Sequence, residues 1–101
     1  MWVLRVSGLP DHPDGKTFRL SDGSVKTIGR ATRADFIVDA ALVSRVHCRF
    51  TATPDGDLEV RDLDSTNGVF VNGQRTEAAR LVPGDKVQIG RVEVVALRDA
   101  E

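Results

Sequence analysis

The strongest constraint on the fold is a two-residue alternation of apolar and polar side chains that turn-forming dipeptides interrupt many times. The alternation is clear in residues 2–6, 58–61 and 86–89. Side chains that alternate in this way lie on opposite faces of a β-strand, so one face of each segment is expected to be buried. The run from Val92 to Leu97 is apolar enough to be a buried or edge-covered strand.

Turn signals separate these runs. They are Asp14-Gly15, Asp22-Gly23, Asp55-Gly56, Asn72-Gly73 and Pro83-Gly84. Glycine supplies a positive φ and proline a fixed φ, as tight turns require. The clearest hairpin is TATPDGDLEV, residues 51–60.

No segment has an apolar helical stripe long enough to predict a helix. Residues 31–41 come nearest, and Phe36 to Val38 within them are better interpreted as a short strand. Many short strands separated by turns predict an all-β sandwich or barrel. We expect its edge strands to carry charged residues such as Arg5 and Glu93, which discourage edge-to-edge pairing.

Length and charge limit the class of protein. A chain of 101 residues fits one domain. The formal net charge of −1 argues against nucleic-acid binding, and no apolar run is long enough to span a membrane. The single cysteine, Cys48, and an N-terminus unlike a signal peptide make the cytoplasm the expected location, or the nucleus if the source is eukaryotic.

Polar residues that the strand pattern does not explain fall into three loops. They are Gly29-Arg30, Ser44-Arg45-Val46-His47 and Ser65-Thr66-Asn67-Gly68, with Asn72-Gly73 following the last. Each alone has an ordinary explanation. Gly29-Arg30 can be a strand-end glycine with a solvated arginine, Ser44-Arg45 a plain turn, and residues 65–68 a turn whose side chains bond their own backbone. The order and spacing of the group are more specific.

A catalytic interpretation of Ser44 and His47 is disfavoured. Residues three apart in an extended strand lie roughly 10 Å apart and on opposite faces. A serine nucleophile and its base need about 2.6–3.2 Å. A bend at Ser44 would shorten the separation, but no third catalytic group or oxyanion site accompanies the pair. We expect no catalytic residue, no metal and no cofactor.

The loops together resemble a forkhead-associated (FHA) domain, a phosphothreonine-peptide binding module. The resemblance rests on Gly29-Arg30, Ser44-x-x-His47, Ser65-Thr66-Asn67-Gly68 and Asn72-Gly73, and extends from about Trp2 to Leu97. It implies a β-sandwich of two twisted, mostly antiparallel sheets with about eleven short strands. It also implies a single domain over residues 1–101, with a core at about 2–97.

The resemblance assigns roles to individual residues. Phosphate binding is expected of Arg30, Ser44, Arg45 and Thr66, and Asn67 is expected to bind the peptide backbone. Structural support is expected of Gly29, His47, Gly68, Asn72 and Gly73. Arg33, Leu42, Val43 and Arg75 are candidates for reading residues near the phosphothreonine, with an acidic or an apolar preference equally open.

The partner implied is a phosphothreonine-containing protein or peptide, a Ser/Thr kinase or its substrate, and neither nucleic acid nor membrane. One alternative remains open. The same fold can serve as a phosphorylation-independent protein–protein module that uses a sheet face or edge. Binding that survives dephosphorylation of the partner would favour that alternative.

Overall fold

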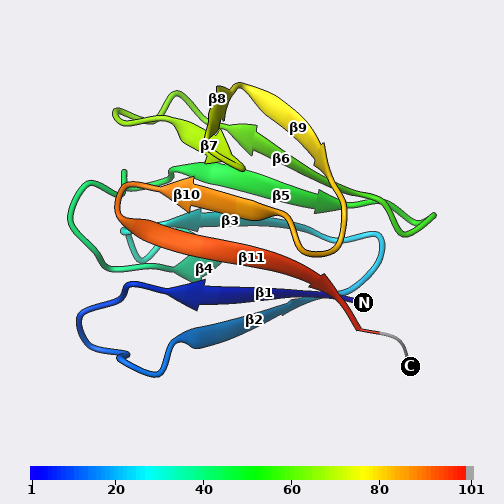
Figure 1. Cartoon of the computed structure of the whole chain (residues 1–101), viewed down its shortest axis with the longest axis horizontal. Helices are drawn as coiled ribbons and strands as arrows, with labels where there is room; N and C mark the ends of the chain where they lie inside the picture. Colours follow the sequence, from blue (N-terminus) through cyan, green and yellow to red (C-terminus); the bar gives the residue numbers. More distant parts are fainter. Residues whose placement is uncertain (100–101) are drawn as a thin grey trace.

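The computed structural model describes residues 1–99, which form eleven β-strands and no helix (Figure 1). The strands are β1 (Trp2–Ser7), β2 (Lys16–Leu20), β3 (Val25–Gly29), β4 (Phe36–Ile37), β5 (Cys48–Ala52), β6 (Leu58–Asp62), β7 (Val69–Val71), β8 (Gln74–Thr76), β9 (Ala78–Leu81), β10 (Lys86–Ile89) and β11 (Val92–Arg98). The all-β prediction is confirmed over this part of the chain. The short strand expected at Phe36 to Val38 is β4, and the hairpin expected at residues 51–60 joins β5 to β6.

The strands form two sheets that face each other as a sandwich (Figure 1). The six-stranded sheet has the order β2-β1-β11-β10-β7-β8, and the five-stranded sheet has the order β4-β3-β5-β6-β9. The neighbouring pairs with a described register are antiparallel, except that β3 and β4 are parallel. Of the two architectures that the alternation left open, sandwich and barrel, the chain adopts the sandwich.

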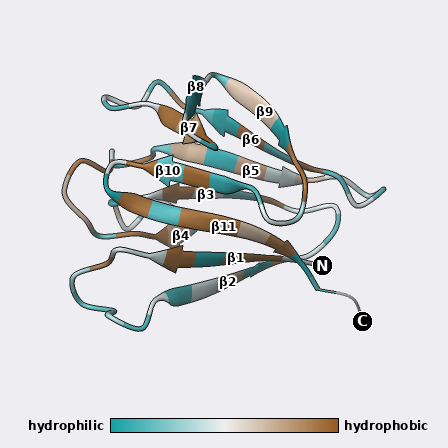
Figure 2. Cartoon of the chain, viewed as in Figure 1, coloured by the Kyte–Doolittle hydropathy of each residue, from teal (hydrophilic) through white to brown (hydrophobic). Residues whose placement is uncertain are grey.

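The core lies between the sheets and is filled by every second residue of the strands. In β1, Trp2, Leu4 and Val6 are buried, whereas Arg5 is exposed. Strands of both sheets alternate in hydropathy along their length (Figure 2). Each large aliphatic or aromatic side chain that is fully buried contributes about 1.5–3 kcal/mol. These contributions hold the sheets together and leave the connecting loops free to carry polar groups.

The prediction that Arg5 and Glu93 protect edge strands is wrong. Arg5 lies on β1, between β2 and β11, and Glu93 lies on β11, between β1 and β10. Both are exposed because the alternation directs them to the outer face of the six-stranded sheet. Three of the four edge strands, β4, β8 and β9, are instead only two, three and four residues long, and the fourth, β2, has five. Short edges give little template for pairing with another chain.

The Asn72-Gly73 hairpin turn forms between β7 and β8 as predicted. The φ angles of Asn72 and Gly73 are 49° and 87°, as a type I′ turn requires. The Asn72 amide donates to Asp85 Oδ1 at 3.0 Å, and its Oδ1 accepts from the Lys86 backbone N–H at 3.0 Å. The turn is therefore tied to the start of β10.

Three loops gather at one end of the sandwich, and the start of β1 and the end of β11 lie at the other (Figure 1). These loops are residues 30–35 (β3–β4), 38–47 (β4–β5) and 63–68 (β6–β7). At the terminal end, Arg98 makes two hydrogen bonds to Asp22, at 2.6 and 2.9 Å. The Trp2 indole there donates to the Gly56 carbonyl at 3.0 Å. These contacts stabilise this end of the sandwich, and none of them involves the three loops.

Candidate functional site

The site begins at Gly29, where β3 ends and two loops touch. A Cβ atom at this position would lie 2.1 Å from the backbone oxygen of Arg45. The backbone N–H of Arg30 donates to the Ser44 carbonyl at 3.0 Å, and that of Ala31 to the Arg45 carbonyl at 3.0 Å. The absence of a side chain at Gly29 therefore allows the β3–β4 and β4–β5 loops to be joined backbone to backbone.

Arg30 is exposed, and its side chain is held against the second of these loops. Its Nε donates to the Val43 carbonyl at 3.1 Å. This bond uses one of the five N–H donors of the guanidinium and leaves the terminal nitrogens available. Arg30 thus presents a fixed positive charge with a two-pronged set of donors at the end of the sandwich.

His47 is fully buried and connects two loops. Its Nδ1 accepts the backbone N–H of Ser44 at 3.0 Å, and its Nε2 lies 2.8 Å from the Gly68 carbonyl. Since Nδ1 accepts, the ring proton belongs on Nε2, which donates to Gly68. Both ring nitrogens are therefore engaged with backbone groups.

The separation of roughly 10 Å expected for Ser44 and His47 is wrong. These residues precede β5 in a turning loop rather than in an extended strand, so the ring reaches back to Ser44. It meets the backbone N–H of that residue. The Ser44 hydroxyl has another partner, the Thr66 backbone N–H at 3.1 Å. The bend therefore produces a support for the loop.

The β6–β7 loop is fixed by a chain of side-chain-to-backbone bonds. Asp62 Oδ1 accepts from Ser65 N–H at 3.0 Å, and Ser65 Oγ accepts from Gly68 N–H at 2.9 Å. Gly68 has a φ of 86°, which a residue with a side chain rarely adopts. The turn is also crowded, since a Cβ there would lie 2.7 Å from Arg75 Nε. These constraints set Thr66 and Asn67 at the exposed tip.

Asn67 reaches across to the β4–β5 loop. Its Nδ2 donates to the Leu42 carbonyl at 2.9 Å. Leu42 is itself exposed and has a φ of 70°, an uncommon conformation for a leucine. The two loops therefore meet at two points, where Thr66 bonds to Ser44 and where Asn67 bonds to Leu42.

Two shallow hollows meet at Arg30, Ser44 and Thr66. The first, of about 480 Å³, is also lined by Arg33, Arg45, Val46, Leu63 and Asp64. The second, of about 400 Å³, is also lined by Ala41, Leu42, Val43 and Asn67. One hollow is thus rich in cations and the other is largely apolar. The three residues that they share are three of the four expected to hold a phosphate, and the fourth, Arg45, lines the first hollow alone.

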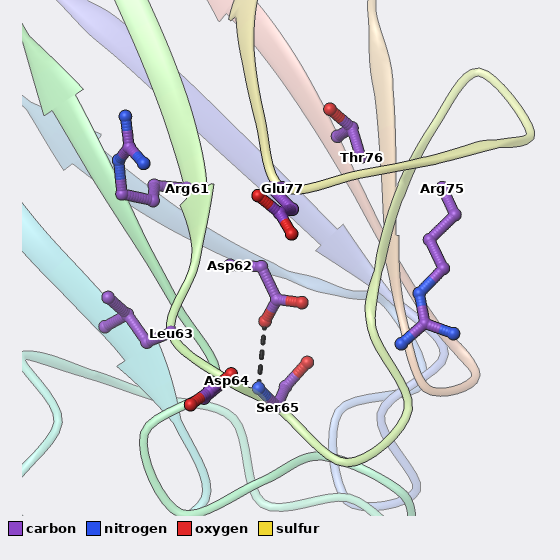
Figure 3. Close-up of a pocket in the computed structure, with 8 residues that line it drawn as sticks. All are labelled: Arg61, Asp62, Leu63, Asp64, Ser65, Arg75, Thr76 and Glu77. Carbon is purple, nitrogen blue, oxygen red and sulfur yellow. Dashed lines mark hydrogen bonds between the residues drawn. The ribbon is translucent and has the colours of Figure 1, made fainter.

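Three candidate residues, Arg75, Asn72 and Gly73, line neither of these two hollows. Arg75 lines a third hollow of about 720 Å³ on the far side of the β6–β7 loop. Figure 3 shows Asp62 and Glu77 on one side of that hollow and Arg75 on the other. Asn72 and Gly73 lie in the β7–β8 turn and line none of these hollows.

Sequence reasoning missed the contact between Asp35 and Thr27. Asp35 Oδ2 accepts from the Thr27 backbone N–H at 2.8 Å and from its hydroxyl at 3.1 Å. The Asp35 backbone N–H donates to Thr27 Oγ1 at 3.0 Å. The backbone and then the side-chain hydrogen bond from Thr27 hold the pKa of Asp35 below its ordinary value. This pair closes the base of the loop that carries Arg30 and Arg33.

Three further observations concern the described part of the chain. Burial raises the pKa of the Cys48 thiol far above its ordinary value. No group of three or more His, Cys, Asp or Glu residues among 1–99 is arranged to hold a metal ion. In the same residues, no helix has the length and apolarity needed to cross a membrane.

Comparison with known proteins connects these loops to one family. The FHA domain model matches residues 26–90, which contain all three loops. An ABC transporter ATP-binding/permease protein of Mycobacterium tuberculosis is 45% identical over 83 residues, which are 82% of this chain and 9% of that protein. Glycogen accumulation regulator GarA of Mycolicibacterium smegmatis is 35% identical over 104 residues, covering 94% of this chain and 65% of that protein.

A solved structure from an analysis of phosphothreonine-dependent FHA domain interactions has the same architecture. It superposes with a TM-score of 0.85 at 28% identity, over 99% of this chain and 98% of that one. The curated relatives above are longer, since this chain spans 9% of one and 65% of the other. The likeness therefore concerns one domain of such proteins.

Proposed function

Because the chain belongs to the FHA domain family, we propose that Arg30, Ser44, Thr66 and Asn67 bind phosphothreonine-containing segments of partner proteins. The observation that supports this proposal best is the convergence of Arg30, Ser44 and Thr66 from three loops onto the border between two hollows. The partner is a protein that a Ser/Thr kinase phosphorylates, or the kinase itself.

The phosphate is bound by donors whose positions are already fixed. A phosphothreonine carries about −1.5 to −2 charges near neutral pH and three strong acceptor oxygens. Arg30 supplies the opposing charge through its terminal nitrogens. Ser44 Oγ accepts the Thr66 N–H, so its own proton is free to be donated to a phosphate oxygen. Thr66 contributes its hydroxyl, because its backbone N–H is engaged with Ser44.

Asn67 is proposed to hold the peptide main chain. Its Nδ2 is bonded to the Leu42 carbonyl, which orients the amide and leaves Oδ1 to accept a peptide N–H. Arg45 is proposed to contact the phosphate or the peptide backbone. A grip on both phosphate and main chain explains why free phosphate is expected to bind poorly.

Preference for phosphothreonine over phosphoserine is a further part of the proposal. One methyl group moved from water into an apolar site contributes about 0.8 kcal/mol. Contact with the apolar hollow would therefore favour phosphothreonine about fourfold. A larger preference requires that the methyl group also fix the rotamer of the phosphate.

The proposal excludes catalysis at Ser44. Neither ring nitrogen of His47 contacts the Ser44 hydroxyl, since one is bonded to the Ser44 backbone and the other to Gly68. A base that makes no hydrogen bond to the serine hydroxyl cannot take its proton and activate it as a nucleophile. We expect no hydrolysis of ester or phosphate substrates. A hydrolase activity that Ser44→Ala abolishes would contradict this part of the proposal.

The domain is proposed to be one unit over residues 1–101 with its core at about 2–97. Pairing of β1 with β11, which joins the two ends of the chain, supports these limits. The proposed location is the cytoplasm, where kinases have ATP and where the unpaired Cys48 thiol is stable.

Titration with one peptide in four forms tests the function. The central residue is phosphothreonine, phosphoserine, threonine or glutamate, and Kd is measured by fluorescence anisotropy. We expect tightest binding for phosphothreonine and little for threonine. Loss of a hydrogen bond to a charged group costs about 1.5–3 kcal/mol, so Arg30→Ala should weaken binding at least tenfold.

Arg80→Ala is the matched control, because Arg80 is 75% exposed on β9 and lines neither hollow at the site. Equal binding of the phosphorylated and plain peptides, across several sequences, would favour the phosphorylation-independent alternative instead.

A further inference from the structure

The hollow of about 480 Å³ collects positive charge from two different loops. Arg30, Arg33 and Arg45 line it, and the one carboxylate among its lining residues belongs to Asp64. Within residues 1–99, none of these three guanidinium groups has a carboxylate oxygen within 4.0 Å. The whole chain, by contrast, has a formal net charge of −1.

The backbone holds these cations close together. Arg33 lies on the β3–β4 loop and Arg45 on the β4–β5 loop, and the bonds from Arg30 and Ala31 to the carbonyls of Ser44 and Arg45 join the two loops. Asp35, two residues after Arg33, is anchored to Thr27. The loops therefore cannot separate readily to relieve repulsion among like charges. Such an arrangement attracts anions into the hollow.

The second hollow at the site has a different character. Beyond the three shared residues it is lined by Ala41, Leu42, Val43 and Asn67, which carry no charge. A peptide whose phosphate lies at the shared residues would thus have a cationic surface on one side and an uncharged surface on the other. Arg33 and Arg45 therefore lie on one side of the phosphate only.

We propose that Arg33 and Arg45 form a subsite for a second anionic group, close in sequence to the phosphothreonine of the same peptide. This inference rests on the proposed function, which assigns the first phosphate to Arg30, Ser44 and Thr66. The chemistry recognised is an acidic oxygen cluster, which either an Asp or Glu carboxylate or a second phosphorylated residue provides. Arg45 lies beside Ser44 and serves both anions, whereas Arg33 serves the second alone.

A peptide series measures the effect. The reference is a neutral, alanine-rich peptide with one phosphothreonine. Glutamate, and separately phosphoserine, is placed one or two residues before or after the phosphothreonine, with glutamine and serine as the matched neutral residues. An exposed ion pair contributes about 0.2–1 kcal/mol and a charge-assisted hydrogen bond more. We expect about fivefold tighter binding for glutamate and about tenfold for phosphoserine, on one side of the phosphothreonine.

Variants locate the gain. Arg33→Gln should abolish it and leave Kd for the reference peptide within about twofold, whereas Arg45→Gln should weaken every phosphopeptide. Arg80→Gln, which removes the same charge elsewhere, should change nothing. Raising the salt concentration toward 1 M shortens the Debye length to about 3 Å and should shrink the gain.

The outcomes separate the two proposals. If no phosphothreonine peptide binds, the proposed function fails and the inference fails with it. If the reference peptide binds but neither glutamate nor phosphoserine improves Kd beyond twofold at any position, the function stands and the second subsite is refuted. A gain that persists in Arg33→Gln would likewise refute the assignment. A gain with phosphoserine alone, lost in Arg33→Gln, would identify a second phosphate as the ligand.

Discussion

Replacement of Gly29 by alanine should break the connection between the loops that form the site. The added Cβ would lie 2.1 Å from the Arg45 carbonyl oxygen, whereas ordinary contact begins at 3.4 Å. The loops must therefore move apart by about 1.3 Å. The bonds from the Arg30 and Ala31 N–H groups, each 3.0 Å long, would then exceed the range of a hydrogen bond.

The expected cost follows from these displacements. Two lost hydrogen bonds remove about 1 kcal/mol each, and a methyl group forced into a filled site costs about 1–3 kcal/mol. The free energy of unfolding should fall by about 3–5 kcal/mol. A domain has about 5–15 kcal/mol in total, so the variant should still fold in buffer unless the parent lies at the low end of that range. Displacement of Arg30 relative to Ser44 should also weaken phosphopeptide binding at least tenfold.

Urea unfolding measures the loss of stability. Trp2, the single tryptophan, is 3% exposed and far from the loops, so its fluorescence reports global unfolding. Gly23→Ala is the matched control. Gly23 has a φ of 84°, but no atom lies within 4 Å of the place that the added methyl group would take, so this variant should lose only about 1–2 kcal/mol and keep its affinity. If Gly29→Ala loses no more stability than Gly23→Ala and binds the phosphopeptide as tightly as Gly23→Ala does, then the close approach of the two loops at Gly29 is not what holds the site together.

Three further outcomes are expected. His47→Ala removes two buried hydrogen bonds and leaves a cavity. The free energy of unfolding, measured with urea, should therefore fall by about 3–4 kcal/mol, and phosphopeptide affinity should fall as well. Unchanged affinity would show that the loops hold their shape without the ring. Because the pKa of Asp35 is lowered in the folded state, the contribution of Asp35 to stability is complete above its ordinary pKa of 3.8 and is lost as pH falls through the lower folded value. Melting curves from pH 6 to pH 2 should therefore show a smaller acid-induced loss of stability in Asp35→Asn than in the parent. Identical losses would contradict the role given to Thr27. The buried Cys48 thiol, whose pKa is raised, should react with a thiol reagent only after urea unfolds the chain, and fast reaction in buffer would mean that β5 opens locally.

The strand content was predictable because alternation and turn residues are local properties of the sequence. Asn72-Gly73 specifies its own hairpin, and the alternation from Trp2 to Val6 specifies which face is buried. The order of strands in each sheet is not local. Arg5 and Glu93 were therefore assigned to edges although β1 and β11 lie inside the six-stranded sheet.

The members of the candidate site were predictable from a resemblance, but their contacts were not. The spacing of Ser44 and His47 suggested an extended segment, whereas the loop turns and brings the ring to the Ser44 backbone. Nothing in the sequence near Asp35 indicates that it bonds Thr27, eight residues earlier. The division between a cationic and an apolar hollow likewise depends on how three distant loops fold together.

The positions of β1 and β11 determine where the domain can be linked to a surface or to another protein without covering the loops. The start of β1 and the end of β11 lie at the end of the molecule away from the loops (Figure 1). The longest dimension of the domain is 33 Å. A bead, a surface or a further protein fused at either end leaves the loops unobstructed. A tail beginning near Asp99 would need at least about ten extended residues to travel the length of its own domain. A shorter tail can reach only the loops of a neighbouring molecule, so its capture would grow with protein concentration.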